Sequence, residues 1–219
     1  MGIDVLEQTL NTGVVPCIKT NRPVDYLAYA QAMYDGGARV MEVTLTSYNA
    51  LEAIKKISSH FGDRMAVAAG TVLNPQAVND VIDNGGRLIV TPTMQPEVIK
   101  TAVKRGVPIY CGAFTATECQ NALDAGATMI KIFPAKVGGP AYMTNLRMII
   151  PNIKLIPSGG VSMDNAADYI RCGASAVSGA RVFMDHEEIK KHGPEWITGR
   201  VSGFIERIKE ARKDLPEIP

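Results

Sequence analysis

One repeating unit restricts the fold of this chain more than any other feature. It is a short apolar segment of strand length, followed by a segment with apolar residues at helical spacing that ends at or near a glycine. A glycine just past a helix can adopt the left-handed conformation that turns the chain into the next strand. The unit predicts strands at 13–19, 40–45, 65–70, 88–91, 108–111, around Lys131, 153–156 and 174–178. The helices that follow these strands are predicted at 23–34, 50–61, 75–84, 96–105, 116–125, 141–150, 165–171 and 195–213.

Strict alternation of strands and helices with short connections predicts a parallel sheet. Eight such units favour an α/β fold in which the sheet closes on itself, the (β/α)8 TIM barrel. A further amphipathic segment at 3–11, with Asp4 as its N-cap and Gly13 just past its end, predicts an extra N-terminal helix. A length of 219 residues suits one barrel domain over 1–219, with a loose tail expected at 214–219.

Composition limits the classes of partner. The apolar fraction of 46% is ample for a large core, and the net charge of +1 gives no broad attraction to nucleic acid or to an anionic membrane. The four cysteines show no spacing typical of a metal site, and the two at 111 and 172 are expected to be buried thiols. No signal peptide and no apolar run long enough to span a bilayer is visible, so we expect a cytoplasmic protein.

Two charged residues interrupt strands that should be apolar on both faces. Lys131 stands between Ile130 and Ile132, and Glu42 lies near the end of the second strand. An amine that loses hydration has a lowered pKa, and its neutral, nucleophilic form then becomes available, so we interpret Lys131 as a Schiff-base lysine. Because alternate strands fill one layer of a barrel, strands two and six can bring Glu42 and Lys131 face to face. The alternative is a structural ion pair that fills the barrel centre.

Two loops of small residues follow the seventh and eighth strands, where barrels of this class often bind phosphate. Backbone amides around Ser158, Gly159 and Gly160 can converge on an anion, together with those around Gly179 and Ala180. Arg181 lies next to this second loop, although an arginine there is more often on the surface. A glycine pair by itself usually marks only a turn.

A third loop, after the third strand, offers the hydroxyl of Thr71 as a donor. The same loop also has the pattern of a helix start, with Asn74 as N-cap and Pro75 at the first helical position. The two interpretations are compatible.

Five motifs occur together and in order: Glu42-Val43-Thr44-Leu45, Ala69-Gly70-Thr71-Val72-Leu73, Thr91-Pro92, Lys131-Ile132-Phe133-Pro134-Ala135 and Ser158-Gly159-Gly160-Val161. With them the chain resembles, from about Gly13 to Val182, the class I 2-keto-3-deoxy-6-phosphogluconate (KDPG) aldolases. It is similar also to their relatives that act on the phosphogalactonate epimer and on 4-hydroxy-2-oxoglutarate.

The resemblance implies a catalytic role for two residues: Lys131 forms the Schiff base and Glu42 shuttles protons. It further implies that Thr71 helps to hold the substrate carboxylate, that Pro92 and Phe133 pack on the pyruvate moiety, and that the loops at Ser158–Gly160 and Gly179 bind phosphate. It implies a phosphorylated 2-keto acid as substrate, a homotrimer, and no metal or other cofactor.

Two positions depart from the family pattern. Many members carry arginines at the end of strand one and just after strand two, where this chain has Lys19 and Thr46. Lys19 keeps the charge without the bidentate geometry of arginine, and Thr46 keeps no charge. Ser158 stands where threonine is frequent and retains the hydroxyl. These departures bear on the preferred substrate more than on the chemistry, and 4-hydroxy-2-oxoglutarate remains an alternative main substrate.

Two other functions are compatible with a barrel. A phosphosugar isomerase or epimerase would want histidine or aspartate at strand ends, whereas His60, His186 and His192 fall on helices or in the last loop. A barrel that binds a phosphorylated metabolite without catalysis is the alternative from a different class.

Overall fold

The computed structural model describes residues 2–213 and 215. The tail expected at 214–219 therefore lies outside the described residues except for Leu215. Eight strands form one parallel sheet in the order β7-β6-β5-β4-β3-β2-β1-β8. A backbone hydrogen bond of 2.8 Å from the amide of Ser175, two residues before β8 begins, to the carbonyl of Leu155 in β7 links the two ends of this order. The predicted (β/α)8 TIM barrel is confirmed.

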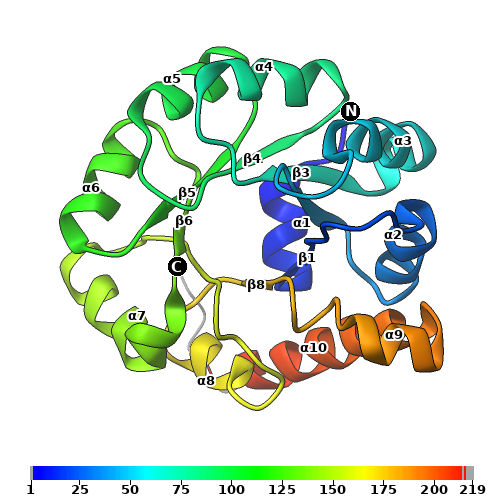
Figure 1. Ribbon diagram of the computed structural model, residues 1–219. Helices are drawn as coiled ribbons and strands as arrows, with labels where there is room; N and C mark the ends of the chain where they lie inside the picture. The colour runs from blue at the N-terminus through cyan, green and yellow to red at the C-terminus, as the bar shows by residue number, and fades with distance from the viewer. Residues whose placement is uncertain (1, 214, 216–219) are drawn as a thin grey trace.

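The strands are β1 (Val14–Ile18), β2 (Val40–Thr44), β3 (Ala66–Gly70), β4 (Leu88–Val90), β5 (Ile109–Ala113), β6 (Met129–Ile132), β7 (Leu155–Pro157) and β8 (Val177–Gly179). The helices around them are α2 (Tyr26–Asp35), α3 (Ala50–Phe61), α4 (Pro75–Asp83), α5 (Pro96–Lys104), α6 (Ala116–Asp124), α7 (Gly139–Ile149), α8 (Ala166–Arg171), α9 (His186–His192) and α10 (Glu195–Lys213). Two short 3-10 helices are η1 (Gly62–Arg64) and η2 (Ala135–Val137). Figure 1 shows the helices as an outer ring around the strands.

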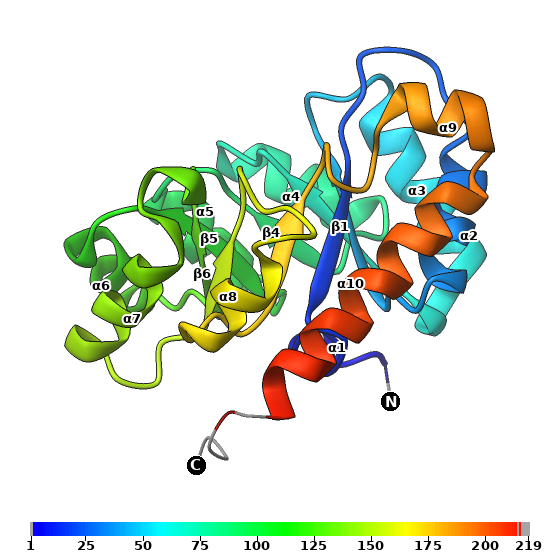
Figure 2. The ribbon, with the colours of Figure 1, turned by 90° about the horizontal axis from the view of Figure 1, so that it is seen from below.

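The extra N-terminal helix α1 (Val5–Thr12) covers one end of the barrel. Asp4 caps it by accepting a hydrogen bond from the amide of Glu7, as predicted. Its apolar residues pack on a cluster of inward-facing strand residues, and the Tyr110 hydroxyl donates to Thr9 Oγ1 at 2.7 Å. Figure 2 shows α1 at the end of the barrel where β1 begins. That end is therefore filled and covered.

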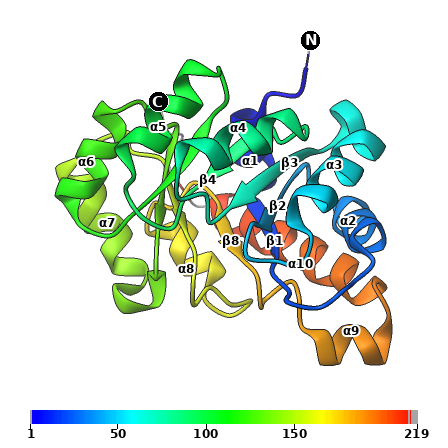
Figure 3. The ribbon, with the colours of Figure 1, turned by 45° about the horizontal axis from the view of Figure 1, so that its top comes forward.

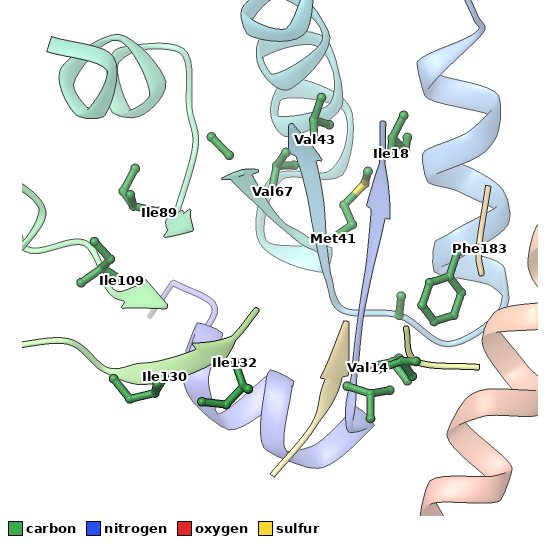
Figure 4. Close-up of a cluster of buried hydrophobic side chains, with 14 of the residues drawn as sticks. Val14, Ile18, Met41, Val43, Val67, Ile89, Ile109, Ile130, Ile132 and Phe183 are labelled. Atoms are coloured by element: carbon green, nitrogen blue, oxygen red, sulfur yellow. The ribbon is translucent and has the colours of Figure 1, made fainter. Parts of the chain in front are cut away.

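The main core lies between the strands and the helices. Figure 4 shows side chains on the outer faces of the strands, among them Met41, Val67, Ile89 and Ile130, pointing away from the barrel interior. Because successive side chains of a strand alternate between faces, the neighbours of these residues point inward. This parity puts Glu42 and Lys131 inside the barrel.

The element boundaries differ from the prediction in several places. Residues 186–192, expected in the last loop, form α9, which Figure 3 shows at the edge of the barrel beside α10. Only Ile189 of this helix is buried, so no apolar period marks it, and Asp185 caps it through the amides of Glu187 and Glu188. Helix α2 begins at Tyr26 rather than 23 because Asp25 is its N-cap. Cys172, expected to be buried, is only partly so.

No helix in the described ranges, 2–213 plus 215, has both the length and the apolar character that crossing a membrane requires.

Candidate active site

The two charges predicted to face each other inside the barrel do meet. Lys131 Nζ on β6 donates a hydrogen bond to Glu42 Oε2 on β2 at 3.2 Å, and this contact is also an ion pair. Glu42 is 2% exposed and Lys131 8% exposed. A buried carboxylate needs a partner, and here the amine supplies it.

The second oxygen of this carboxylate has a different neighbour. The thiol of Cys17, on β1, donates to Glu42 Oε1 over 3.4 Å. Cys17 and Glu42 are paired residues of adjacent parallel strands. Burial, and then the nearby charge of Glu42, raise the pKa of the Cys17 thiol well above its usual range, so it stays protonated and able to donate.

Gly70 leaves the space that the Glu42 side chain occupies. A Cβ atom on Gly70, at the end of β3, would lie 1.9 Å from Glu42 Oε1. No larger residue fits there without displacing the carboxylate. The glycine is thus part of what fixes the position of Glu42.

A cavity of about 240 Å³ opens directly above the ion pair, at the ends of the strands. The eleven site residues expected from the sequence all border it: Lys19, Glu42, Thr71, Pro92, Lys131, Phe133, Ser158, Gly159, Gly160, Gly179 and Ala180. They come from seven of the eight strands or from the loops just after them. One cavity thus holds both the predicted nucleophile and the predicted phosphate loops.

The Ser158–Gly160 loop, predicted to bind phosphate, is held by hydrogen bonds to β6 and to the segment after it. The Ser158 amide donates to the carbonyl of Ile132 at 3.0 Å, and the carbonyls of Ser158 and Gly159 accept from the amides of Ala135 and Lys136. The loop can turn here because Gly159 has φ of 79°, and a Cβ atom on it would lie 2.9 Å from the Phe133 ring. The donors that remain for an anion are the Ser158 hydroxyl and the glycine amides.

The residues expected around pyruvate also border the cavity. Thr71 has φ of 60°, and Asn74 after it accepts from the amide of Ala77 as the N-cap of α4. The interpretation as a helix start is confirmed, whereas the role of the Thr71 hydroxyl as a donor to the substrate stays a prediction. The cation of Lys19 is exposed at the cavity. Thr46 does not border the cavity, and its hydroxyl donates to Thr44 Oγ1 at 3.2 Å.

Six further residues border the cavity and were not assigned to the site from the sequence: Cys17, Thr44, Val161, Ser178, Arg181 and Val182. Strand parity could have found three of them, since Cys17, Thr44 and Ser178 lie two residues from expected site residues and so on the same strand face. Arg181 is exposed, as an arginine at this position more often is, and it also borders the cavity.

Within residues 2–213 and 215, no group of three or more histidine, cysteine, aspartate or glutamate side chains is placed to hold a metal ion.

Comparisons with known proteins identify the family that this chain resembles. The family model for "Aldolase: KDPG and KHG aldolase" matches residues 5–199. The chain is 34% identical over 191 residues to 2-dehydro-3-deoxy-6-phosphogalactonate aldolase of Escherichia coli K12, covering 86% of this chain and 91% of that protein. It is 33% identical over 205 residues to the KHG/KDPG aldolase of the same organism, covering 93% of this chain and 96% of that one.

Among solved structures, KDPG aldolase from Legionella pneumophila, with pyruvate captured at low pH as a covalent carbinolamine intermediate, superposes with a TM-score of 0.82. It is 28% identical and covers 89% of this chain and 95% of that chain.

Proposed function

The chain belongs to the KDPG and KHG aldolase family and is thus a carbon–carbon lyase, and we propose that it cleaves a 2-keto-3-deoxy-6-phospho sugar acid through a Schiff base on Lys131. The products are pyruvate and D-glyceraldehyde 3-phosphate. The single observation that carries the proposal is the buried amine of Lys131, paired with Glu42 beneath a cavity that also contains two loops of small residues.

Schiff-base formation begins when the neutral amine of Lys131 attacks the C2 ketone. The amine becomes neutral by giving one proton of the ion pair to Glu42 Oε2, to which it is hydrogen-bonded. Glu42 returns that proton to the C2 oxygen, then takes a second proton from the attached nitrogen and gives it to the carbinolamine hydroxyl, which leaves as water. The iminium that results draws electrons from the neighbouring C3–C4 bond. The covalent carbinolamine captured in the Legionella enzyme supports, for the family, the addition to the ketone that precedes the iminium.

Cleavage needs a base at the C4 hydroxyl. Glu42 removes that proton directly or through one water, the C3–C4 bond breaks, and its electron pair forms the enamine while the aldehyde departs. Protonation of the enamine at C3 and hydrolysis by water then release pyruvate and restore the amine. Glu42 thus accepts and returns a proton in each half of the cycle.

The remaining residues bind the substrate. In this proposal Thr71 and Lys19 hold the carboxylate, and Pro92 and Phe133 pack against the pyruvate moiety. Ser158, Gly159, Gly160, Gly179 and Ala180 bind the phosphate, with the cation of Arg181 beside them. The shared cavity supports these roles, because one ligand can reach all of these groups.

A second substrate, 4-hydroxy-2-oxoglutarate, has support from the relative named KHG/KDPG aldolase. It lacks a phosphate and would leave the Ser158–Gly160 loop unused. A comparison of kcat/KM for the phosphogluconate-type, phosphogalactonate-type and hydroxyoxoglutarate substrates distinguishes these preferences.

Borohydride trapping tests the central claim. Incubation with pyruvate and borohydride should add one reduced pyruvyl group, found on Lys131 by peptide mass spectrometry. If the protein gains no adduct, the Schiff-base mechanism is wrong and a binding function without catalysis remains. If the adduct is on another lysine, the assignment to Lys131 is wrong.

The family resemblance also leads us to propose a homotrimer in the cytoplasm. Large apolar side chains that are exposed on η2 and α7, namely Val137, Met148 and Ile149, support burial against another copy. The free thiols at 17, 111, 119 and 172 support a reducing compartment. Light scattering coupled to size-exclusion chromatography measures the oligomeric state, and cell fractionation the location.

A further inference from the structure

The two oxygens of the Glu42 carboxylate have unequal surroundings. Oε2 accepts from the Lys131 amine, whereas Oε1 accepts from the Cys17 thiol and lies against the bare Cα of Gly70. The last torsion of a glutamate side chain is broad and does not by itself fix which oxygen points where. Its neighbours must therefore set the orientation.

We propose that Cys17 is a positioning residue for Glu42, which holds Oε1 so that Oε2 is the oxygen that exchanges protons with Lys131 and the substrate. The inference rests on the proposed function, since it concerns the base of the Schiff-base cycle. The proposal assigns a role to Cys17, which would otherwise be one of several buried thiols.

The placement of Cys17 suits this role. It is 4% exposed, it is the last but one residue of β1, and the pairing of β1 with β2 puts its Cα directly beside that of Glu42. The charged groups that face the thiol are Glu42, Lys131 and Lys19. The thiol remains protonated beside the carboxylate, so it acts as a donor and not as a nucleophile.

A purely structural role makes a different prediction. Buried cysteine often behaves as a small apolar residue, and valine would then replace Cys17 with little effect on chemistry. Valine fills the space without a donor, whereas serine keeps a donor in a smaller side chain. Comparison of Cys17→Val with Cys17→Ser therefore separates hydrogen bonding from packing.

The exchange of pyruvate methyl protons with D2O isolates the step in question. A methyl C–H bond of the iminium breaks, its electron pair forms the enamine, and the proton passes to Glu42. Deuterium acquired by the carboxyl group then returns to the same carbon. Borohydride trapping in parallel measures how much Schiff base forms, independently of this proton transfer.

We expect Cys17→Val to trap pyruvate on Lys131 to the wild-type level while exchange slows about tenfold, as loss of one hydrogen bond to a charged group implies. Cys17→Ser should exchange within about twofold of wild type. Cys17→Ala, which removes the donor without adding volume, should slow exchange as valine does. Cys111→Val is the matched control. Cys111 is also a buried thiol on a barrel strand, and its side chain does not border the cavity.

Wild-type exchange in Cys17→Val and Cys17→Ala would overturn the inference, as would equal slowing in Cys17→Ser. Wild-type protein that forms no adduct and shows no exchange would instead overturn the proposed function, and this inference with it. The two failures are therefore distinguishable in one set of measurements.

Discussion

Lys131 Nζ and Glu42 Oε2 lie 3.2 Å apart although 89 positions separate the two residues in the chain. They meet because β2 and β6 stand on opposite sides of a closed barrel and both side chains point inward. In a buried pair of this kind, removal of one charge destabilises the fold, because the other charge is then buried without a partner.

A double-mutant cycle tests that dependence. Lys131→Met keeps most of the bulk but leaves the carboxylate unpaired, so we expect a loss of about 3 kcal/mol in the free energy of unfolding. Adding Glu42→Gln to Lys131→Met should recover most of this loss. We expect no aldolase activity in either the single or the double variant. Urea unfolding and a coupled assay of pyruvate release provide the measurements. Near-normal turnover in Lys131→Met would remove this residue from the mechanism.

Ser158→Ala tests the phosphate loop. Loss of the hydroxyl should raise KM for the phosphorylated substrates by about tenfold, the effect of one hydrogen bond to a charged group, and should change KM for 4-hydroxy-2-oxoglutarate much less. Steady-state kinetics on both substrate types checks this. Equal effects on the two would argue against phosphate binding at this loop.

Gly70→Ala probes the space around Glu42. The new methyl group would lie 1.9 Å from Oε1, so the carboxylate must move and lose its contacts with Cys17 and Lys131. We expect kcat to fall by at least about 100-fold, the contribution of a well-placed acid–base group. Gly199→Ala is a useful control, since no atom lies within 4 Å of its added Cβ and an alanine within α10 should stabilise the protein by about 1 kcal/mol. An active Gly70→Ala enzyme would show that Glu42 tolerates displacement.

The buried thiols predict a fall in stability at alkaline pH. Burial raises the pKa of Cys119 to about 12, so the folded state keeps a proton that the unfolded chain releases above its ordinary thiol pKa of about 8.5. The unfolded state then binds fewer protons, and the free energy of unfolding decreases as pH rises, by at most about 1.4 kcal/mol per unit for each such thiol. Cys119→Ala should make this dependence less steep. Urea unfolding at pH 7 to 10 measures it, and parallel curves for the two proteins would contradict the prediction.

The barrel could be predicted from the sequence because the pattern that indicates it is repeated along the chain. Each apolar run and each glycine after a helix repeats one local rule, and the eight repeats agree with one another. Helix α9 lacks such a period, since it buries only Ile189 and depends on a cap at Asp185. Local polar capping is harder to recognise than an apolar stripe, so this helix was missed.

The sequence likewise predicted some residues that line the candidate site and not others. Lys131 and Glu42 stood out because each is a charge in an apolar strand, and the Ser158–Gly160 loop because of its composition. Cys17 and Gly70 carry no such signal, because one is a common apolar-like residue and the other one of many glycines. Their importance comes from contacts across neighbouring strands with Glu42, and these depend on register, which the sequence pattern does not specify.

The closure of one end of the barrel by α1 has a consequence for the order of events in turnover. In the part of the chain that the structure describes, apolar side chains fill that end, so in the proposed cycle substrate, water and products use the cavity at the opposite ends of the strands. If the loops at Ser158–Gly160 and Gly179 bind the phosphate as proposed, an aldehyde that is still bound there lies between the enamine and incoming water. Hydrolysis must then wait for its departure, so the aldehyde is the first product to leave and pyruvate the last, and pyruvate should inhibit competitively against the substrate.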